Sequence, residues 1–444
     1  MNYTFDTICA IATPLSTGGI GVIRISGEDA IEIAAKIFNK KIVPKAINHG
    51  WIVYKGEKID EVIILPFLAP NSYTGENVAE IQTHGSPVVI NQILNIILEN
   101  GARLAQKGEF TKRAFLNHKI DLSQAEAVLD LINSKTQKSA HGAAGSLSGL
   151  LRIKTEEIKS KISDILGKII ASLDFPDDVA EVGYDEIIKN IEDAIYEIKE
   201  ILKNAKMHNI LRQGIKVAVA GRPNAGKSSL FNALLNLERA IVTEIEGTTR
   251  DTITESLEIN GISVTLIDTA GIRDKSPDKV EKIGIEQSKN AIEQADVVLC
   301  LYDGSCGFSE ADKKIFELAN NKKHIVVRTK SDLCGKSNKT TEDEISISSK
   351  TKEGIDELKR AIYNEITELN PAGSEFLTNQ RHQYCFRAAL EALENALQGA
   401  KDGELQDLIS IDLKAALTNL GEISGEVITD DILNNIFENF CIGK

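Results

Sequence analysis

The stretch IKVAVAGRPNAGKSSLFNALLN, residues 215–236, decides the fold of the central part of the chain. An apolar run typical of a buried strand leads into GRPNAGKS (221–228), which fits the pattern G-x-x-x-x-G-K-[ST], and an amphipathic helical segment follows. Gly221 and Gly226 let the backbone wrap a phosphate, and the N–H groups at the start of the helix bind the anion. Strand, loop and helix in this order predict a nucleotide-binding α/β domain.

The same loop supplies the predicted phosphate and magnesium ligands. Lys227 brings charge to the β- and γ-phosphates, which makes it a candidate catalytic residue, and the hydroxyl of Ser228 is a Mg²⁺ ligand. The residues of this loop predicted to contact the nucleotide are Asn224, Ala225, Gly226, Lys227, Ser228 and Ser229.

Spacing downstream distinguishes between classes of nucleotide hydrolase. DTAG (268–271) ends an apolar strand, so that its Asp lies toward Mg²⁺ and its Gly N–H toward the γ-phosphate. Upstream, Asn260-Gly261 predicts a hairpin, and the polar loop EGTTRD (246–251) can bring the Thr249 hydroxyl to the metal. Together they predict the switch region of a GTPase. Its predicted nucleotide contacts are Thr243, Glu244, Ile245, Glu246, Gly247, Thr248, Thr249, Asp268, Thr269, Ala270 and Gly271.

Base selectivity requires a carboxylate for the N1–H and amino group of guanine. Thr329-Lys330-Ser331-Asp332 follows the predicted strand 324–328 and resembles the NKxD motif, with Asp332 in that role. Thr329 replaces the usual Asn, so one supporting hydrogen bond is altered. Ser348, Ser349 and Lys350 follow another short apolar run, where a loop backs the base. We therefore predict GTP as the nucleotide.

Helical stretches flank this domain. The first 118 residues read as a small mixed α/β unit, with strands at 19–26 and 61–68 and a helix at 86–101. Residues 119–208 and 372–444 carry apolar stripes at helical spacing, and 209–371 alternates strands with helices. The simplest arrangement is one discontinuous helical domain whose stripes pack on each other, with the α/β domain inserted.

Composition limits the partners. The net charge of −14 argues against a protein that coats nucleic acid non-specifically, because such binding depends on neutralising phosphates. One local basic patch, 101–119, is a candidate for RNA contact, and an ordinary solvated surface is an equally good interpretation. Its basic residues are Arg103, Lys107, Lys112, Arg113 and Lys119. No apolar run is long enough to span a membrane, and the N-terminus lacks the charge of a signal peptide. Six scattered cysteines fit a reducing cytoplasm.

Several motifs together resemble the tRNA-modifying GTPase family called MnmE or TrmE. They are GRPNAGKSS, EGTTRD, DTAG, RISG (24–27), NSYTGE (71–76), GEFTKRAFLN (108–117), KIDLSQAEA (119–127) and the terminal CIGK (441–444). The resemblance covers essentially the whole chain. It implies a multidomain α/β plus α fold: an N-terminal folate-binding and dimerisation domain at 1–118, a helical domain at 119–208 and 372–444, and an inserted Ras-like G domain at 209–371.

The resemblance also implies partners and chemistry. Members act as homodimers with an FAD-containing partner of the GidA or MnmG family, in a heterotetramer, on carbon five of the wobble uridine of certain tRNAs. They install an aminomethyl or carboxymethylaminomethyl group whose methylene comes from 5-formyl- or methylene-tetrahydrofolate. By motif, Arg24, Glu80, Lys119 and Lys444 would contact the folate. Without the resemblance, each of these would be read as an isolated surface charge.

The residue after DTAG and the family resemblance together indicate how GTP would be hydrolysed. Ile272 stands after DTAG, where other GTPases have the glutamine that orients water, so catalysis must depend on other groups. The resemblance implies a potassium ion, held by the Asn224 side chain and backbone oxygens of 243–248, and a catalytic glutamate at Glu281. Asp278 competes for that role because the spacing is one residue longer than usual. The potassium ligands implied from 243–248 are Thr243, Ile245 and Thr248.

Cys441 has two interpretations, a small buried hydrophobe or an exposed nucleophile in the modification reaction. Two other functions compete with tRNA modification. An Era-like ribosome-assembly GTPase would carry a basic RNA-binding module, whereas 372–444 has five Lys or Arg against twelve Asp or Glu and no GXXG loop. A non-catalytic GTP-binding scaffold is favoured by Ile272 but not by the intact Lys227.

Overall fold

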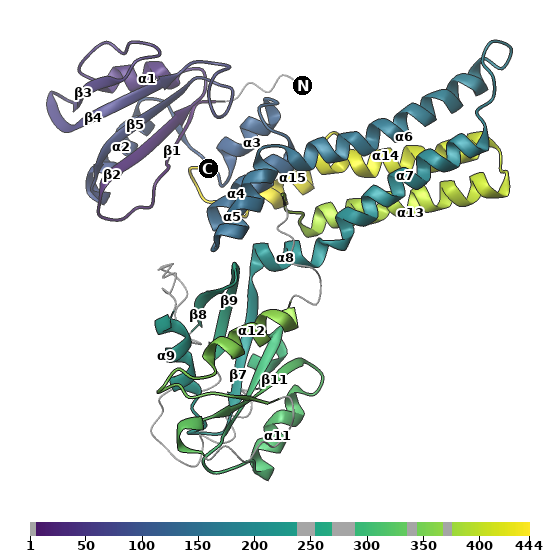
Figure 1. The fold of residues 1–444 in the computed structure, drawn as a ribbon. Coiled ribbons are helices and arrows are strands. Elements are labelled where there is room, and N and C mark those ends of the chain that lie inside the picture. The colour runs from purple at the N-terminus through teal and green to yellow at the C-terminus, as the bar shows by residue number, and fades with distance from the viewer. Residues whose placement is uncertain (1–5, 238–253, 269–288, 335–343, 367–374) are drawn as a thin grey trace. The chain divides into compact units, whose positions relative to one another are not determined.

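The computed structural model describes residues 6–237, 254–268, 289–334, 344–366 and 375–444 (Figure 1). The chain forms two compact units, which are considered separately. The first contains 1–129, 147–194 and 388–444, and the second contains 130–146 and 195–387. The boundaries at 118, 208 and 371 stay predictions.

The first unit begins with a six-stranded sheet in the order β3-β4-β5-β2-β1-β6. Every neighbouring pair is antiparallel except β1 and β6. The strands are β1 (Ile8–Ile11), β2 (Gly18–Ser26), β3 (Asn48–Tyr54), β4 (Glu57–Phe67), β5 (Val78–Gly85) and β6 (Arg103–Leu104). Helices α1 (Ala30–Ile37) and α2 (Pro87–Glu99) pack on this sheet over an isoleucine-rich core. The strands and the helix predicted for this region are confirmed.

Short helices follow the sheet. α3 (Glu109–Leu116) and α4 (Leu122–Asn133) come next in the chain, and α15 (Asp430–Phe437) comes from its other end. Leu122 and Ala125 of α4 share a buried cluster with Leu433, Phe437 and Phe440. The C-terminal segment is therefore held by residues that lie some 300 positions earlier.

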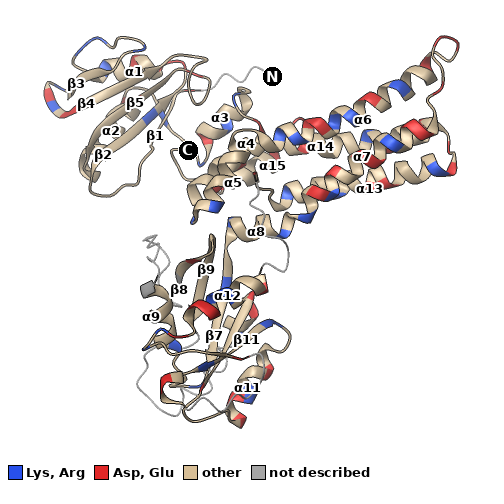
Figure 2. Ribbon diagram, viewed as in Figure 1, with Lys and Arg blue, Asp and Glu red and all other residues tan. Residues whose placement is uncertain are grey.

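Four long helices follow: α6 (Leu150–Asp174), α7 (Tyr184–Lys203), α13 (Gln380–Asp402) and α14 (Gln406–Ser424). α6 and α14 lie wholly in the first unit, whereas α7 and α13 cross its boundaries at 194 and 388. α6 packs on α14, so stripes from either side of the inserted domain pack on each other as predicted. Acidic and basic residues alternate with other residues along these helices (Figure 2).

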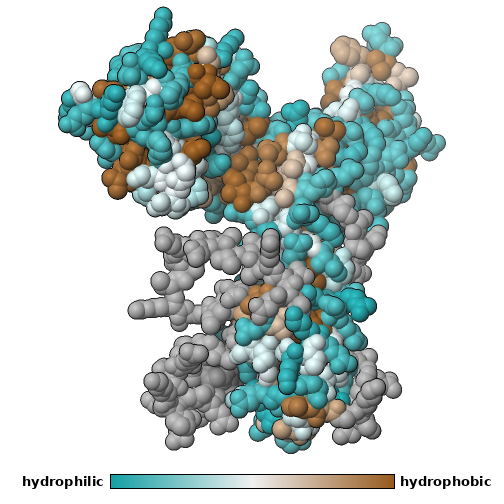
Figure 3. Space-filling model, turned by 60° about the vertical axis from the view of Figure 1, so that its left-hand side comes forward, coloured by the Kyte–Doolittle hydropathy of each residue, from teal (hydrophilic) through white to brown (hydrophobic). Residues whose placement is uncertain are grey.

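The stripes extend less far than expected. Leu173, Leu405 and Leu408, which belong to the predicted apolar stripes of 119–208 and 372–444, are 47%, 70% and 48% exposed. They lie where α6 ends and α14 begins, in turns in which Ser172, Gln406 and Ile409 are buried instead. Figure 3 shows apolar side chains gathered at this end.

The second unit is built on a doubly wound sheet in the order β12-β11-β10-β7-β9-β8. Its strands are β7 (Ile215–Gly221), β8 (Thr254–Ile259), β9 (Ile262–Asp268), β10 (Val297–Asp303), β11 (Lys323–Thr329) and β12 (Ile345–Ser346). Only β8 runs antiparallel, through the predicted hairpin at Asn260-Gly261, where both residues have positive φ. The predicted, largely parallel sheet is confirmed.

Helices cover both faces of this sheet. α9 (Lys227–Leu237) and α12 (Ile355–Ile366) contribute to the larger core, and α11 (Glu310–Ala319) contributes to the other. Because parallel strands are buried on both faces, their residues are apolar without alternation, and all seven residues of β10 are buried.

The chain enters and leaves the sheet domain through one polar junction. It enters by α8 (Ala205–Gln213) and leaves by 375–379, where His208 Nδ1 lies 2.9 Å from Thr378 Oγ1. Ser146, at the end of α5 (Gln137–Leu147), bonds both backbone groups of Leu377. These adjacent ends fit an inserted domain. Across the described ranges, no helix is long and apolar enough to cross a membrane.

Candidate functional site

The glycine-rich loop wraps around the ammonium group of Lys227. Its Nζ lies 2.7 Å from the carbonyl oxygen of Gly221 and 2.8 Å from that of Arg222. Asn224 and Gly226 have φ of 65° and 90°, which the tight loop requires, and a Cβ on Gly221 would lie 2.6 Å from the Leu301 oxygen. α9 begins at Lys227, so its N-terminal N–H groups lie beside this lysine. The arrangement suits a polyphosphate.

An ion pair fixes the loop from outside. Arg222 Nε donates to Asp312 Oδ1 over 2.6 Å, and Asp312 is fully buried. The other oxygen of Asp312 accepts the backbone N–H of Ser309 in a capping box at the start of α11. Arg222 therefore ties the phosphate loop to the capped start of α11. Sequence reasoning missed this residue, because it occupies a variable position of the motif.

Thr329, which replaces the usual Asn, connects the base loop to the phosphate loop. Its buried hydroxyl lies 2.8 Å from the carbonyl oxygen of Ala225 and 3.0 Å from that of Tyr302. With Thr329 in place of the usual Asn, a hydrogen bond therefore still joins the base loop to the phosphate loop.

The predicted base-recognition residues meet at the carboxyl ends of β10, β11 and β12. Lys330 Nζ lies 2.5 Å from Asp303 Oδ2, and the buried Ser348 donates to Asp332 Oδ1 over 2.7 Å. Burial raises the pKa of Asp303, but the hydrogen bonds and charge supplied by Lys330 and Ser305 together outweigh it and leave that pKa below its usual value. Asp332 is exposed and can accept further bonds. Ser349 and Lys350 lie at the surface of the neighbouring loop.

Beneath these loops lies a buried polar group that the sequence did not indicate. Tyr302 donates to Glu344 Oε2 over 2.7 Å, and Arg328 Nη1 lies 4.0 Å from Glu344 Oε1. Tyr302 and Arg328 directly precede Asp303 and Thr329, while Glu344 precedes β12. The group therefore holds together the three strand ends that carry the base loops.

The switch region is only partly described. Ser228 is exposed in the first turn of α9, and the backbone of Asp268 ends β9, the neighbour of β7. The other predicted switch residues lie outside the described residues and stay predictions. They are Thr243, Glu244, Ile245, Glu246, Gly247, Thr248, Thr249, Thr269, Ala270, Gly271, Ile272, Asp278 and Glu281.

A second candidate site lies on the N-terminal sheet. Arg24 of β2 and Glu80 of β5 face each other in the antiparallel register, with Arg24 Nη2 2.8 Å from Glu80 Oε1. The guanidinium also lies over the rings of Tyr73 and Phe110, at 5.3 and 5.6 Å from their centroids. A cation, a carboxylate and two aromatic rings thus meet at one place.

The C-terminal segment reaches this place. Ile442 forms a β-bridge with Lys107, and Arg24 Nη1 lies 3.5 Å from the carbonyl oxygen of Gly443. Gly443 has φ of 98°, and a Cβ there would lie 2.2 Å from the Ile11 oxygen, so only glycine fits. The structure therefore brings Arg24, Glu80 and the CIGK segment together.

The other predicted residues of this site lie nearby. Lys119 Nζ donates to the Pro70 carbonyl over 3.0 Å, at the start of the NSYTGE loop. Lys444 is half-buried, and Cys441 is exposed, as a reactive thiol requires.

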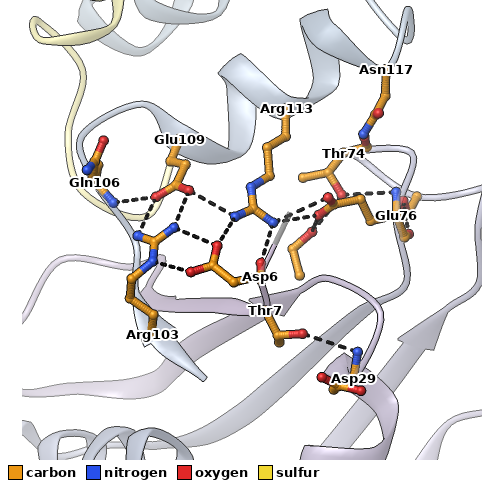
Figure 4. Close-up of polar contacts among 12 residues, drawn as sticks. Asp6, Thr7, Asp29, Thr74, Glu76, Arg103, Gln106, Glu109, Arg113 and Asn117 are labelled. Carbon is orange, nitrogen blue, oxygen red and sulfur yellow. Dashed lines mark hydrogen bonds and ion pairs between the residues drawn. The ribbon is translucent and has the colours of Figure 1, made fainter. Parts of the chain in front are cut away.

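The two arginines of the basic patch at 101–119 are engaged in ion pairs within the fold. Arg103 bonds Asp6 and Glu109, and Arg113, only 1% exposed, bonds Asp6, Glu76 and Glu109 (Figure 4). The bond from Arg103 lowers the pKa of Asp6. At Glu109, burial raises the pKa, but hydrogen bonds from Arg103 and Arg113 contribute to a net lowering. Both arginines thus pair with carboxylates of the fold, and Arg113 is too buried to contact RNA, whereas Arg103 stays partly exposed.

The sheet and loops of the second unit define a class of protein. A glycine-rich loop follows the central strand where the strand order reverses, and a carboxylate loop lies at the adjacent strand ends. This is the plan of a Ras-like P-loop GTPase domain.

Comparisons with known proteins identify the family. The family model described as the MnmE helical domain matches residues 122–441, and the model of the GTP-binding protein TrmE N-terminus matches 7–119. The tRNA modification GTPases MnmE of Thermotoga maritima and Thermoanaerobacter pseudethanolicus are 41% and 43% identical to the chain, over 99% of it and 100% of each relative. That of Carboxydothermus hydrogenoformans is 44% identical, over 99% of both. The chain belongs to the MnmE family of tRNA modification GTPases, as its motifs predicted.

Two solved structures are more distant. Era of Aquifex aeolicus bound to GDP.AlF4⁻ is 27% identical, with a TM-score of 0.28, over 40% of this chain and 66% of that one. The G domain of the Thermotoga maritima FeoB transporter is 30% identical, with a TM-score of 0.27, over 34% of this chain and 98% of that one. These partial matches add nothing to the assignment.

Proposed function

We propose that this chain is a potassium-activated GTP hydrolase that modifies carbon five of the wobble uridine of certain tRNAs, with a tetrahydrofolate one-carbon donor and an FAD-containing partner. The observation that carries the proposal is the pair of sites within one full-length family member: the loop around Lys227 and the cluster around Arg24. The first suits a polyphosphate and the second a folate.

The chain's own groups bind and orient the GTP. Lys227 supplies positive charge to the β- and γ-phosphates, and α9 directs its N-terminal N–H groups at them. The Asp332 carboxylate accepts hydrogen bonds from the N1–H and amino group of guanine. Ser348 supports it by donating to Asp332, and Lys330 holds the neighbouring strand end through Asp303. The bond from Thr329 to Ala225 keeps the base and the phosphates in register.

The donors on this domain fit two cations. The exposed hydroxyl of Ser228 and the strand-end carboxylate Asp268, with Thr249, are oxygen ligands of the kind that Mg²⁺ prefers. The amide oxygen of Asn224, exposed on the left-handed turn of the loop, fits K⁺, with Thr243, Ile245 and Thr248 as further ligands. Both cations would supply positive charge where negative charge develops. Glu281 orients the attacking water.

The N-terminal cluster fits a folate. Glu80 can accept N–H groups of a pterin, and the rings of Tyr73 and Phe110 border the same place. Arg24, Lys119 and Lys444 can meet the carboxylates of the glutamate tail. When bound, 5-formyl- or methylene-tetrahydrofolate would supply the carbon that is transferred. Cys441, in the segment that reaches this cluster, acts in that transfer.

The same family membership supports the assembly. The chain forms a homodimer through its N-terminal domain and joins a GidA/MnmG-family flavoprotein in a heterotetramer that binds tRNA. We place its work in the cytoplasm, where exposed thiols such as Cys441 stay reduced.

Reconstitution tests the proposed function. The purified chain is incubated with the flavoprotein partner, GTP, the folate donor and tRNA that lacks the modification, and the wobble uridine is analysed by mass spectrometry. The modified uridine should form only in the complete mixture. Unchanged uridine in that mixture would overturn the assignment.

Hydrolysis in potassium and in sodium buffer at equal ionic strength tests the cation site separately. We expect fast turnover in potassium and little in sodium, and Asn224→Ala should abolish the difference. Equal rates in both buffers would mean that other groups supply the charge.

A further inference from the structure

We propose that Arg113 is a positioning residue for the one-carbon site, because it links the 71–76 loop to α3, the helix to which both arms of that site are attached. This inference rests on the proposed folate function of the Arg24 cluster. One arm is the 71–76 loop, and the other is the C-terminal segment 441–444.

The 71–76 loop is attached to α3 and to the residue that follows it by three side-chain contacts; Arg113 with Glu76, and Asn117 with Thr74, appear in Figure 4. Arg113 Nη1 lies 3.2 Å from Glu76 Oε2, and Tyr73 and Thr111 share a hydrogen bond of 2.8 Å between their hydroxyls. Just past the helix, Asn117 donates to the Thr74 carbonyl over 2.7 Å. The position of the loop is therefore set by α3.

This loop in turn orients the groups of the cluster. The ring of Tyr73 lies against the guanidinium of Arg24. Glu76 accepts a hydrogen bond of 2.6 Å from Ser26, two residues beyond Arg24 on β2. A shift of Glu76 would thus move both a wall of the cluster and a contact on the strand that carries its arginine.

The C-terminal segment is attached to the same helix. Gly108, the residue before α3, donates to the Cys441 carbonyl over 3.4 Å, and Lys112 donates to Asn434 of α15 over 3.0 Å. A Cβ on Gly108 would lie 2.9 Å from the Phe437 oxygen, so α15 packs directly against the start of α3. Displacing α3 would move the segment that carries Cys441 away from Arg24.

Arg113 holds this helix from within the protein. It is 1% exposed and bonds two other parts of the chain, Asp6 and Glu76, as well as Glu109 one turn earlier on α3. Only the planar fork of a guanidinium presents donors in several fixed directions, and a lysine keeps the charge but not the geometry. Arg103 offers a matched comparison: it also bonds Asp6 and Glu109 of α3, whereas the bond to Glu76 of the loop comes from Arg113.

Binding of 5-formyltetrahydrofolate to the full chain tests the inference, with Arg113→Lys and Glu76→Gln compared with Arg103→Lys. Loss of charged hydrogen bonds should weaken folate binding about tenfold in the first two variants and less than threefold in the third. In the reconstituted reaction, KM for the folate donor should rise while kcat at saturation stays near that of the wild type. GTP hydrolysis should be unchanged in all three, because the P-loop lies in the other compact unit.

The possible outcomes distinguish failure of this inference from failure of the proposed folate function. If the wild-type chain binds no folate, the one-carbon part of the proposed function fails, and the inference fails with it. If the wild type binds folate and Glu76→Gln binds it equally well, the inference alone is overturned. Because Glu76→Gln preserves the shape of the side chain, it tests the inference even if the Arg113→Lys variant does not fold. Equal weakening by Arg103→Lys would also overturn it, since that result reports general stability.

Discussion

The phosphate loop and the Arg24 cluster are assembled in opposite ways. The groups that surround Lys227 lie within six residues of it in the chain, and its two hydrogen-bond acceptors are Gly221 and Arg222. Arg24, by contrast, meets Glu80 and Gly443, which are 56 and 419 positions away. The first site is a local backbone conformation, and the second exists only when both ends of the chain are folded.

The difference determines what should disturb each site. A local loop is changed chiefly by replacing its own side chains or anchors, such as Arg222. The Arg24 cluster depends on α3, α15 and the last four residues, so it should respond to distant changes. The two sites also lie in separate compact units. Single substitutions should therefore affect one site and spare the other.

The largest expected effect is on hydrolysis. Lys227→Ala removes the charge nearest the β- and γ-phosphates and should lower kcat about 10²–10³-fold, the usual cost of losing one transition-state donor. Steady-state phosphate release measures it. Lys216→Ala, which replaces an exposed lysine on β7, is the control. Near-normal turnover of Lys227→Ala would mean that the loop binds GTP without taking part in catalysis.

Acid should loosen the second unit before the first. Burial of His208, helped by the charge of Arg212, lowers its pKa from 6.5 to about 4. The folded chain therefore binds fewer protons than the unfolded chain between those values. The stability of the junction is complete above pH 6.5 and falls by about 3 kcal/mol toward pH 4. For Asp6 and Glu109 the lowered pKa values place the corresponding loss below about pH 4.5.

Amide hydrogen exchange between pH 7 and pH 5 checks this order. Protection should decline around α8 while the N-terminal sheet stays protected, and His208→Asn should remove the pH dependence. Loss of protection in both units at the same pH would show that they do not respond separately.

A smaller effect is expected at the Arg24 cluster. Arg24→Gln removes one ion pair and two contacts with aromatic rings, and should weaken folate binding about tenfold or more. GTP hydrolysis should not change. Calorimetry with 5-formyltetrahydrofolate measures the loss, with Lys36→Gln, an exposed lysine of α1, as the control. Wild-type affinity in Arg24→Gln would remove this cluster from the folate assignment.

The smallest effect concerns the residue that departs from the usual motif. Thr329→Val keeps the shape of the side chain but removes the bond to the Ala225 carbonyl, which should raise KM for GTP about fivefold. Thr329→Ser keeps the hydroxyl and should behave like the wild type. An unchanged KM in Thr329→Val would show that the two loops hold their register without this bond.

The sequence predicted most where the determinants are contiguous. The phosphate loop and the Asn260-Gly261 hairpin were predicted because a few adjacent residues impose the backbone conformation. The Arg222–Asp312 and Tyr302–Glu344 contacts span 90 and 42 positions, and nothing local indicates them. The excess of positive charge read from residues 101–119 was misleading at Arg113 for the same reason. The acidic partners Asp6 and Glu76 lie outside the window in which Arg113 was counted.

Titrating one preparation of the chain with both GTP and 5-formyltetrahydrofolate tests the central claim most directly. The account predicts two independent sites: Lys227→Ala should weaken GTP binding alone, and Arg24→Gln should weaken folate binding alone. A chain that binds GTP but no folate, or one in which either variant abolishes both, would contradict it.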